Sequence, residues 1–371
     1  VRSGLISSVH AFAVSSIGPW FLGYLAVVIV VSVALLIYRL PGLQSDRAIE
    51  SVVSRESGFL LNNLIFAAIT FATLWGTIFP LVTQLFKNLQ LTIGPPFYME
   101  VNGPLMLALM FLMGIGPLLA WRHSSWQLLL RNMLYPVVAG VIAFPILLYL
   151  WREWVPSMAA SVVIFAIGTT VMEYVRGARV RHKNTGEIYP LAVAMLVRKN
   201  GRRYGGYIVH IAIAIMALGI IGSNFFQVER EFTFKPGQTG TIDGYTLTYQ
   251  GLDNRITAQG QSVGAVLNIS QNGVSEGSVE SYRFFYTGFT SQPTAEMGIR
   301  TIGVNDVYVV LDQFQQDGTA GLRVFINPMV SWIWIGGLVY VIGMLTLLWP
   351  SPQPIRREVV QPVREAALSE A

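Results

Sequence analysis

The chain has 371 residues, of which 53% are hydrophobic and only 12% are charged. Globular proteins carry about 25% charged residues, so composition excludes a large soluble core and indicates a membrane protein. The net charge of +5 comes from basic residues beside the apolar runs, which indicates contact with a membrane surface rather than with nucleic acid. There is no cysteine, which excludes a thiol nucleophile, a disulfide and a zinc–thiolate site within the chain.

Seven apolar segments are long enough to cross a bilayer as helices. They are predicted over residues 18–38, 59–81, 104–121, 128–150, 156–175, 205–226 and 328–349. The third segment contains Gly114-Ile115-Gly116-Pro117, and glycines inside a span indicate close helix packing or a kink rather than a nucleotide loop. The apolar stretch from Ile188 to Val197 is too short to span and is predicted to lie on the membrane surface.

The distribution of basic residues predicts the orientation. If the seven spans alternate, the segments 39–58 and 176–204 and the tail share one side, and these are rich in Lys and Arg. Positive-inside bias places that side in the cytoplasm. The prediction is an extracytoplasmic loop over 1–17, six spans with cytoplasmic basic loops over 18–226, an extracytoplasmic domain over 227–327, a last span over 328–350 and a cytoplasmic tail over 351–371.

The segment 227–327 is polar and carries β-hairpin signals. Asp243-Gly244 and Asn272-Gly273 are turn dipeptides between strand-like runs. Further strands are predicted over Val304–Phe314 and Leu322–Ile326. The predicted fold class is therefore an all-α polytopic membrane protein, with about seven transmembrane helices and a small extracytoplasmic β domain.

Four histidines are the only imidazoles available to a metal. His210 interrupts an apolar span, where it either ligates haem iron or donates a hydrogen bond to a neighbouring helix. His10 precedes the first span on the outer side, as a solvated loop residue or a functional one. His123 and His182 lie among basic residues and are expected to be solvated or phosphate-facing. No catalytic triad, paired carboxylates or phosphate loop is evident.

Ordered sequence blocks along the chain resemble the CcmF family, the large membrane subunit of cytochrome c maturation. The blocks are Arg2-Ser3-Gly4 through His10-Ala11-Phe12, Ser54-Arg55-Glu56 with Phe59 to Asn63, Leu74-Trp75-Gly76-Thr77 with Pro80-Leu81, Gly94-Pro95-Pro96 with Tyr98, Gly114 to Pro117, Gly206-Tyr207 with His210, Ser291 to Thr294 through Gly298 to Thr301, Asp306 to Leu311, and Asn327-Pro328.

The resemblance implies a haem lyase of the bacterial inner membrane. Such a lyase takes haem from the chaperone CcmE and promotes thioether attachment to the Cys-X-X-Cys-His motif of apocytochrome c, alongside CcmH/CcmI-type subunits. His10 matches the second of two outer haem ligands, and His210 matches the second of two ligands to a b-type haem in the membrane. Arg2, Ser3 and Gly4 are weaker candidates in the His10 loop.

The first histidine of each pair and the family's tryptophan-rich haem loop are absent from this sequence. Either the sequence is part of a longer protein, as we expect, or the protein is split and another polypeptide supplies the rest. Two other functions stay open. A haem transporter would need a continuous polar pathway through the spans. A non-catalytic assembly scaffold would dock apocytochrome and partner subunits on its β domain, and would purify colourless.

Overall fold

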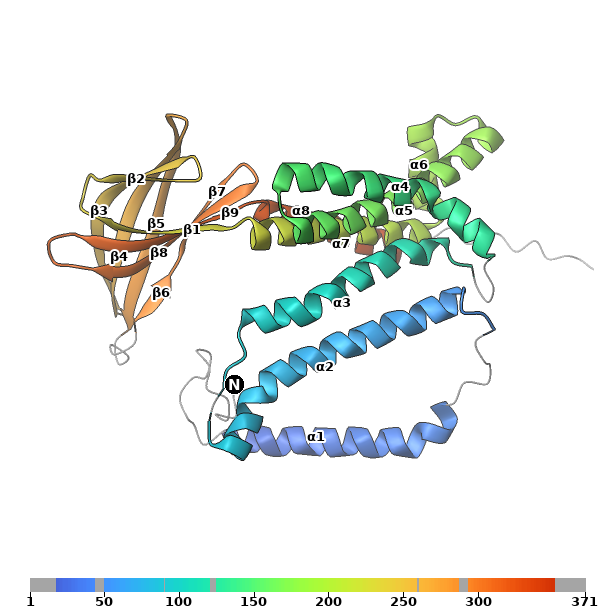
Figure 1. Cartoon of the computed structure of the whole chain (residues 1–371), viewed down its shortest axis with the longest axis horizontal. Helices are drawn as coiled ribbons and strands as arrows, with labels where there is room; N and C mark the ends of the chain where they lie inside the picture. The colour runs from blue at the N-terminus through green and yellow to red at the C-terminus, as the bar shows by residue number, and fades with distance from the viewer. Residues whose placement is uncertain are drawn as a thin grey trace, which may run out of the picture.

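The computed structural model describes residues 18–43, 50–89, 91–120, 125–258, 260–286 and 293–350. In these residues a group of helices and a β-sandwich lie end to end, with the sandwich beyond one end of the helices (Figure 1).

The described chain contains eight α-helices. They are α1 (Gly18–Arg39), α2 (Arg55–Lys87), α3 (Pro95–Ile115), α4 (Trp126–Trp151), α5 (Trp154–Thr185), α6 (Tyr189–Lys199), α7 (Gly201–Phe225) and α8 (Val330–Leu348), with short 3-10 turns over Leu40–Leu43 and Gly116–Leu118. All except α6 are long and apolar enough to cross a membrane, which confirms the predicted polytopic fold with seven spans.

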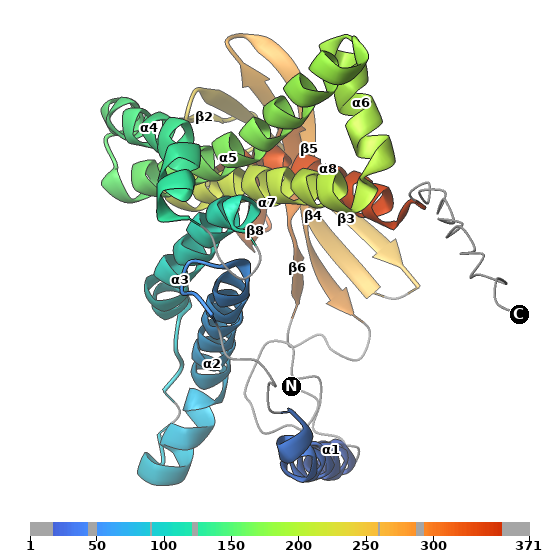
Figure 2. The ribbon, with the colours of Figure 1, turned by 90° about the vertical axis from the view of Figure 1, so that its right-hand side faces the viewer.

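Helix α5 is the most enclosed of the spans. Half of its apolar window is buried, whereas no residue in the window of α1 is buried. Small residues let its neighbours approach: Gly114 of α3 lies against Phe165, and Gly140 of α4 lies against the backbone oxygen of Ser161. Figures 1 and 2 show α1 at the edge of the helical part, on the far side from α7 and α8.

The basic segment after the fifth span differs from the predicted loop. Helix α5 continues to Thr185 and ends where Gly186 adopts a left-handed backbone, with φ at 71°. Arg176, Arg179 and Arg181 therefore lie on a helical extension of α5. Hydrophobic periodicity ends where a helix leaves the membrane, so the sequence pattern misses a polar continuation of the same helix.

Helices α7 and α8 form a tightly packed antiparallel hairpin (Figure 2). A side chain on Gly205 would lie 2.8 Å from the backbone nitrogen of Leu347, and one on Gly336 would lie 2.9 Å from the backbone oxygen of Ala212. Glycine at these positions brings the two backbones into contact, which is how helices associate in lipid.

Two antiparallel sheets make the sandwich. One has the order β1-β9-β8-β7 and the other the order β2-β3-β4-β5-β6. The strands are β1 (Val228–Phe234), β2 (Thr239–Ile242), β3 (Tyr245–Thr257), β4 (Gly260–Gln271), β5 (Val274–Tyr286), β6 (Thr294–Glu296), β7 (Gly298–Ile302), β8 (Asn305–Phe314) and β9 (Ala320–Asn327). Fully buried side chains from both sheets, including Tyr249, Leu267 and Val309, form one core.

The predicted hairpin turns are confirmed. Asp243 and Gly244 join β2 to β3 with φ angles of 46° and 79°. Asn272 and Gly273 join β4 to β5 with φ angles of 52° and 82°. Two consecutive positive φ angles define the tight turn whose twist suits a hairpin, and Asn, Asp and Gly adopt them at low cost.

The sandwich is anchored to the helical hairpin through its first and last strands. Strand β1 follows α7 directly, β9 leads into α8, and the two strands pair from Val228 opposite Ile326. At the junction the amide of Gln227 donates to Oδ1 of Asn327 over 2.5 Å. The positions of α7 and the sandwich are therefore coupled.

Candidate functional site

His210 lies nine residues after the start of α7, about 14 Å along the helix. Its Nδ1 atom is buried and has no hydrogen-bond partner among the described residues. The residue as a whole is half-buried. The bond to a neighbouring helix that the sequence left open is thus not found for Nδ1 among the described residues.

The face of α7 that carries His210 turns toward α5. Tyr207 precedes His210 by three residues and Ala214 follows it by four, so all three lie on one side of the helix. Both neighbours are buried, and Ala214 packs in a cluster with Val163 of α5. The imidazole is therefore held beside the most enclosed span.

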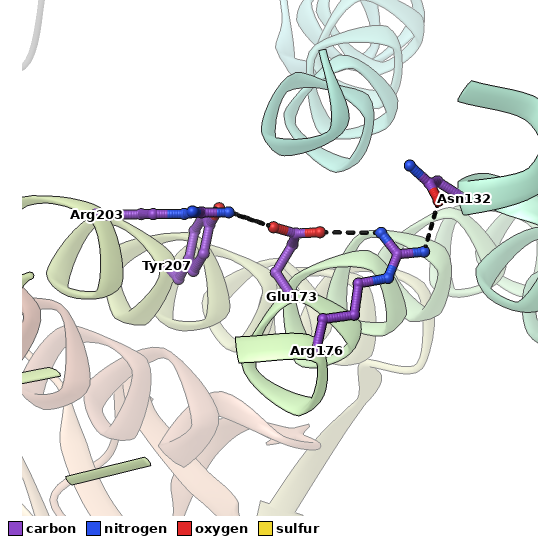
Figure 3. A network of polar contacts seen from close by, with 5 residues as sticks. All are labelled: Asn132, Glu173, Arg176, Arg203 and Tyr207. Atoms are coloured by element: carbon purple, nitrogen blue, oxygen red, sulfur yellow. Dashed lines mark hydrogen bonds and ion pairs between the residues drawn. The ribbon is translucent and has the colours of Figure 1, made fainter. Parts of the chain in front are cut away.

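A polar network crosses three helices one to two turns from His210, toward the start of α7 (Figure 3). The carboxylate of Glu173 accepts from Arg176 over 3.1 Å and from Arg203 over 2.6 Å. Arg176 also donates to Oδ1 of Asn132 over 2.9 Å, and Arg203 donates to the hydroxyl of Tyr207 over 2.9 Å. Asn132 belongs to α4, so the network connects α4, α5 and α7.

The network carries an excess positive charge. One carboxylate, only 9% exposed, serves two guanidinium groups. A buried carboxylate is costly unless it is paired and hydrogen-bonded, and this pairing satisfies it. The aromatic rings of Tyr204 and Tyr207 lie 5.8 and 5.7 Å from the guanidinium carbon of Arg203 and add attraction for the cation.

Sequence reasoning missed this network. The sequence pattern places Arg176 and Arg203 in a cytoplasmic loop and gives Glu173 no role. The available signal was an acidic residue next to an apolar span with arginine three residues later on the same helix face. The partner on α7 lies 30 residues further along the chain, so only the tertiary fold brings it to Glu173.

A second charged pair closes the turn between α5 and α6. Arg181 donates to both carboxylate oxygens of Glu187, over 2.5 and 2.7 Å, and its hydrogen bonds hold the pKa of Glu187 below its usual range. His182 is half-buried: its Nδ1 lies 2.7 Å from the backbone oxygen of Glu187 and its ring stacks on Tyr189. We assign His182 a structural role.

Several predicted site residues lie outside the described residues. They are His10, Arg2, Ser3 and Gly4 in the first loop, together with His123. Within the described ranges, no group of three or more His, Asp or Glu side chains could hold a metal ion. An iron ligand from this part of the chain would therefore act singly.

Two of the sequence blocks meet in space. A side chain on Gly76 of α2 would overlap Tyr98 of α3, 2.6 Å from its hydroxyl oxygen, so the tyrosine ring fills the space that glycine leaves. Asn327 is nearly fully buried at the junction of sandwich and helices. These blocks therefore have packing roles.

The fold defines a class: a polytopic membrane protein whose last two spans carry a β-sandwich between them. Residues 225–328 match the family model described as the CcmF C-terminal beta-sandwich. The chain is 31% identical over 352 residues to the cytochrome c-type biogenesis protein CcmF of Haemophilus influenzae, covering 94% of this chain and 53% of that protein. It is 30% identical over 350 residues to CcmF of Pseudomonas aeruginosa, covering 92% and 51%.

A solved structure of the cytochrome c heme lyase CcmF is also similar. It aligns with a TM-score of 0.65 and 26% identity, over 81% of this chain and 46% of that chain. The chain is therefore similar to CcmF proteins over nearly its whole length, and it spans about half the length of the curated relatives it matches.

Proposed function

We propose that this chain acts in cytochrome c biogenesis as part of a haem lyase, which attaches haem to the Cys-X-X-Cys-His motif of apocytochrome c. The similarity to CcmF over nearly the whole chain supports the proposal. The single observation that carries it is His210, an imidazole without a hydrogen-bond partner among the described residues of an apolar span.

His210 fits an axial ligand of a b-type haem within the membrane. A neutral imidazole binds haem iron through one ring nitrogen, and Nδ1 of His210 makes no hydrogen bond among the described residues. When bound, the haem would supply one-electron reduction of the iron in the substrate haem. The contribution of this chain is to hold one axial position at a fixed depth beside α5.

His10 is proposed as an axial ligand of the substrate haem at the outer face, with Arg2, Ser3 and Gly4 in the same loop. Each thioether forms when a cysteine thiol of the substrate adds across a haem vinyl group. The lyase needs no thiol of its own for this step, which agrees with the absence of cysteine. Its task is to hold the porphyrin and the thiol in one relative orientation.

The proposed surroundings follow from the same assignment. Haem would come from a CcmE-type chaperone, and CcmH/CcmI-type subunits would present the apocytochrome. The protein would lie in the bacterial inner membrane with the sandwich outside the cytoplasm. A haem transporter is less well supported, because the polar network of the described residues connects helices near the start of α7 and does not form a path along the spans.

The test uses a longer protein. It joins this chain to the region that the curated relatives contain outside the part that matches this chain. His210→Ala is expected to convert a low-spin six-coordinate haem spectrum to high-spin, or to abolish haem retention, because one axial ligand is lost. His10→Ala should leave that spectrum intact but abolish covalent attachment to apocytochrome c.

His182→Ala is the matched control, since it removes an imidazole on the extension of α5. It should retain the low-spin spectrum. If His210→Ala also keeps an unchanged low-spin spectrum at full haem occupancy, His210 is not the ligand. A protein that purifies without haem at all would support the scaffold instead.

A further inference from the structure

A pocket of about 550 Å³ opens between α5, α6 and α7, beside the polar network. Three arginines line it, Arg176, Arg181 and Arg203, together with Asn200 at the start of α7. Val180 and Leu196 provide apolar lining. The pocket therefore has one cationic wall and one apolar wall.

The cationic wall has unused hydrogen-bonding capacity. Arg203 donates from Nε and one terminal nitrogen, and its side chain is 58% exposed. Arg176 donates from both terminal nitrogens, which leaves Nε without a partner among the described residues. Because Glu173 compensates only one of these two charges, the pocket keeps a positive charge that can pair with an anion.

The surrounding sequence adds to the positive electrostatic potential of the pocket. Residues 173–204 carry eight Lys and Arg against two Glu. The N-cap residue of α7, Asn200, lines the pocket, and its side chain makes no capping hydrogen bond. The start of a helix attracts negative charge, so this end of α7 adds to the arginine field.

The position of the pocket identifies the kind of anion. It lies between the start of α7 and the last turns of α5, and if both helices cross the membrane this is the level of the lipid headgroups. An amphiphile there places its phosphate against the arginines and its upper chain against Val180 and Leu196. We propose that this pocket binds the headgroup of an acidic phospholipid. The inference does not depend on the haem assignment of His210.

The test is native mass spectrometry of the purified whole protein, exchanged into vesicles of phosphatidylcholine that contain phosphatidylglycerol. The double variant Arg176→Gln/Arg203→Gln should retain about tenfold less phosphatidylglycerol, because two charge-assisted contacts to the phosphate are lost. Arg179→Gln/Lys183→Gln is the matched control. It removes the same two charges from exposed positions on α5 outside the pocket and should leave retention within about twofold of the parent protein.

A second variant keeps every charge. Asn184→Trp places a large ring at an exposed, pocket-lining position, and it should lower phosphatidylglycerol retention by steric exclusion even if the arginine variant fails to insert. Equal losses for the two double variants, Arg176→Gln/Arg203→Gln and Arg179→Gln/Lys183→Gln, would overturn the site in favour of a diffuse positive charge. Displacement of the lipid by inorganic phosphate would assign a soluble anion instead. Unchanged lipid retention with an altered haem spectrum would assign the arginines to haem carboxylates.

Discussion

Glu173 is a buried carboxylate whose charge is compensated by two arginines. Its carboxylate is 9% exposed and lies within 3.1 Å of two guanidinium nitrogens, from Arg176 and Arg203. Breaking a buried ion pair costs several kcal/mol because it leaves a charge without compensation. Here the cost is moderated, since the Arg203 side chain is 58% exposed and water can screen it.

We therefore expect Glu173→Gln to lower the free energy of unfolding of the helical part by about 2 kcal/mol. The amide keeps the shape of the side chain but leaves two cations unbalanced at the contact of α4, α5 and α7. Thermal unfolding in detergent, followed by helical circular dichroism, measures the change. Glu100→Gln, on an exposed position of α3, is the control and should be near neutral. Equal melting temperatures for the two variants would show that the network does not stabilise the bundle.

Helices α7 and α8 each contain two adjacent glycines, one packed against the partner helix and one not. Gly205 and Gly336 face the partner helix, where an added side chain would meet backbone atoms within 2.9 Å. Their immediate neighbours Gly206 and Gly337 have no atom within 4 Å of the same hypothetical carbon. Each helix thus carries an adjacent pair of glycines, of which one lies in the contact and the other outside it.

Gly205→Ala and Gly336→Ala are each expected to destabilise the hairpin by about 2 kcal/mol, because overpacking forces the two backbones apart. Gly206→Ala and Gly337→Ala should be neutral or stabilise by up to about 1 kcal/mol, since alanine favours the helix. Protection of the α8 amides from hydrogen exchange in detergent reports the difference. Loss of protection in all four variants would mean that helix propensity, and not the close contact, controls the hairpin.

The same elements show what sequence patterns can and cannot predict. The spans and the turns at Asp243-Gly244 and Asn272-Gly273 were predictable because run length and turn dipeptides are local signals. The extension of α5 was missed because a polar helix has no apolar periodicity. His210 was recognised from its apolar surroundings, but the lack of a hydrogen-bond partner among the described residues depends on where α5 lies.

At the scale of the whole molecule, α6 and the sandwich occupy opposite ends of the helical part (Figure 1). Helix α7 separates them with 25 residues, about 37 Å, which is enough to cross the hydrocarbon core of a bilayer. Helix α6 and the basic extension of α5 both precede α7 in the chain, and the sandwich follows α7. The basic segment before α7 and the sandwich after it must therefore lie on opposite sides of the membrane if α7 spans it.

Positive-inside bias predicts that the end that carries α6 faces the cytoplasm, because residues 176–204 hold eight Lys and Arg within a short connection between spans. An enzyme reporter that is active only in the periplasm should be silent when fused after Asn184, and active when inserted at the exposed turn beside Asn272. Replacing four basic residues outside the pocket, Arg179, Lys183, Arg198 and Lys199, by Gln should reduce the asymmetry of the two signals if this charge sets the orientation. An active reporter at Asn184 with a silent one at Asn272 would place the sandwich in the cytoplasm. An outer haem site beside it would then be untenable.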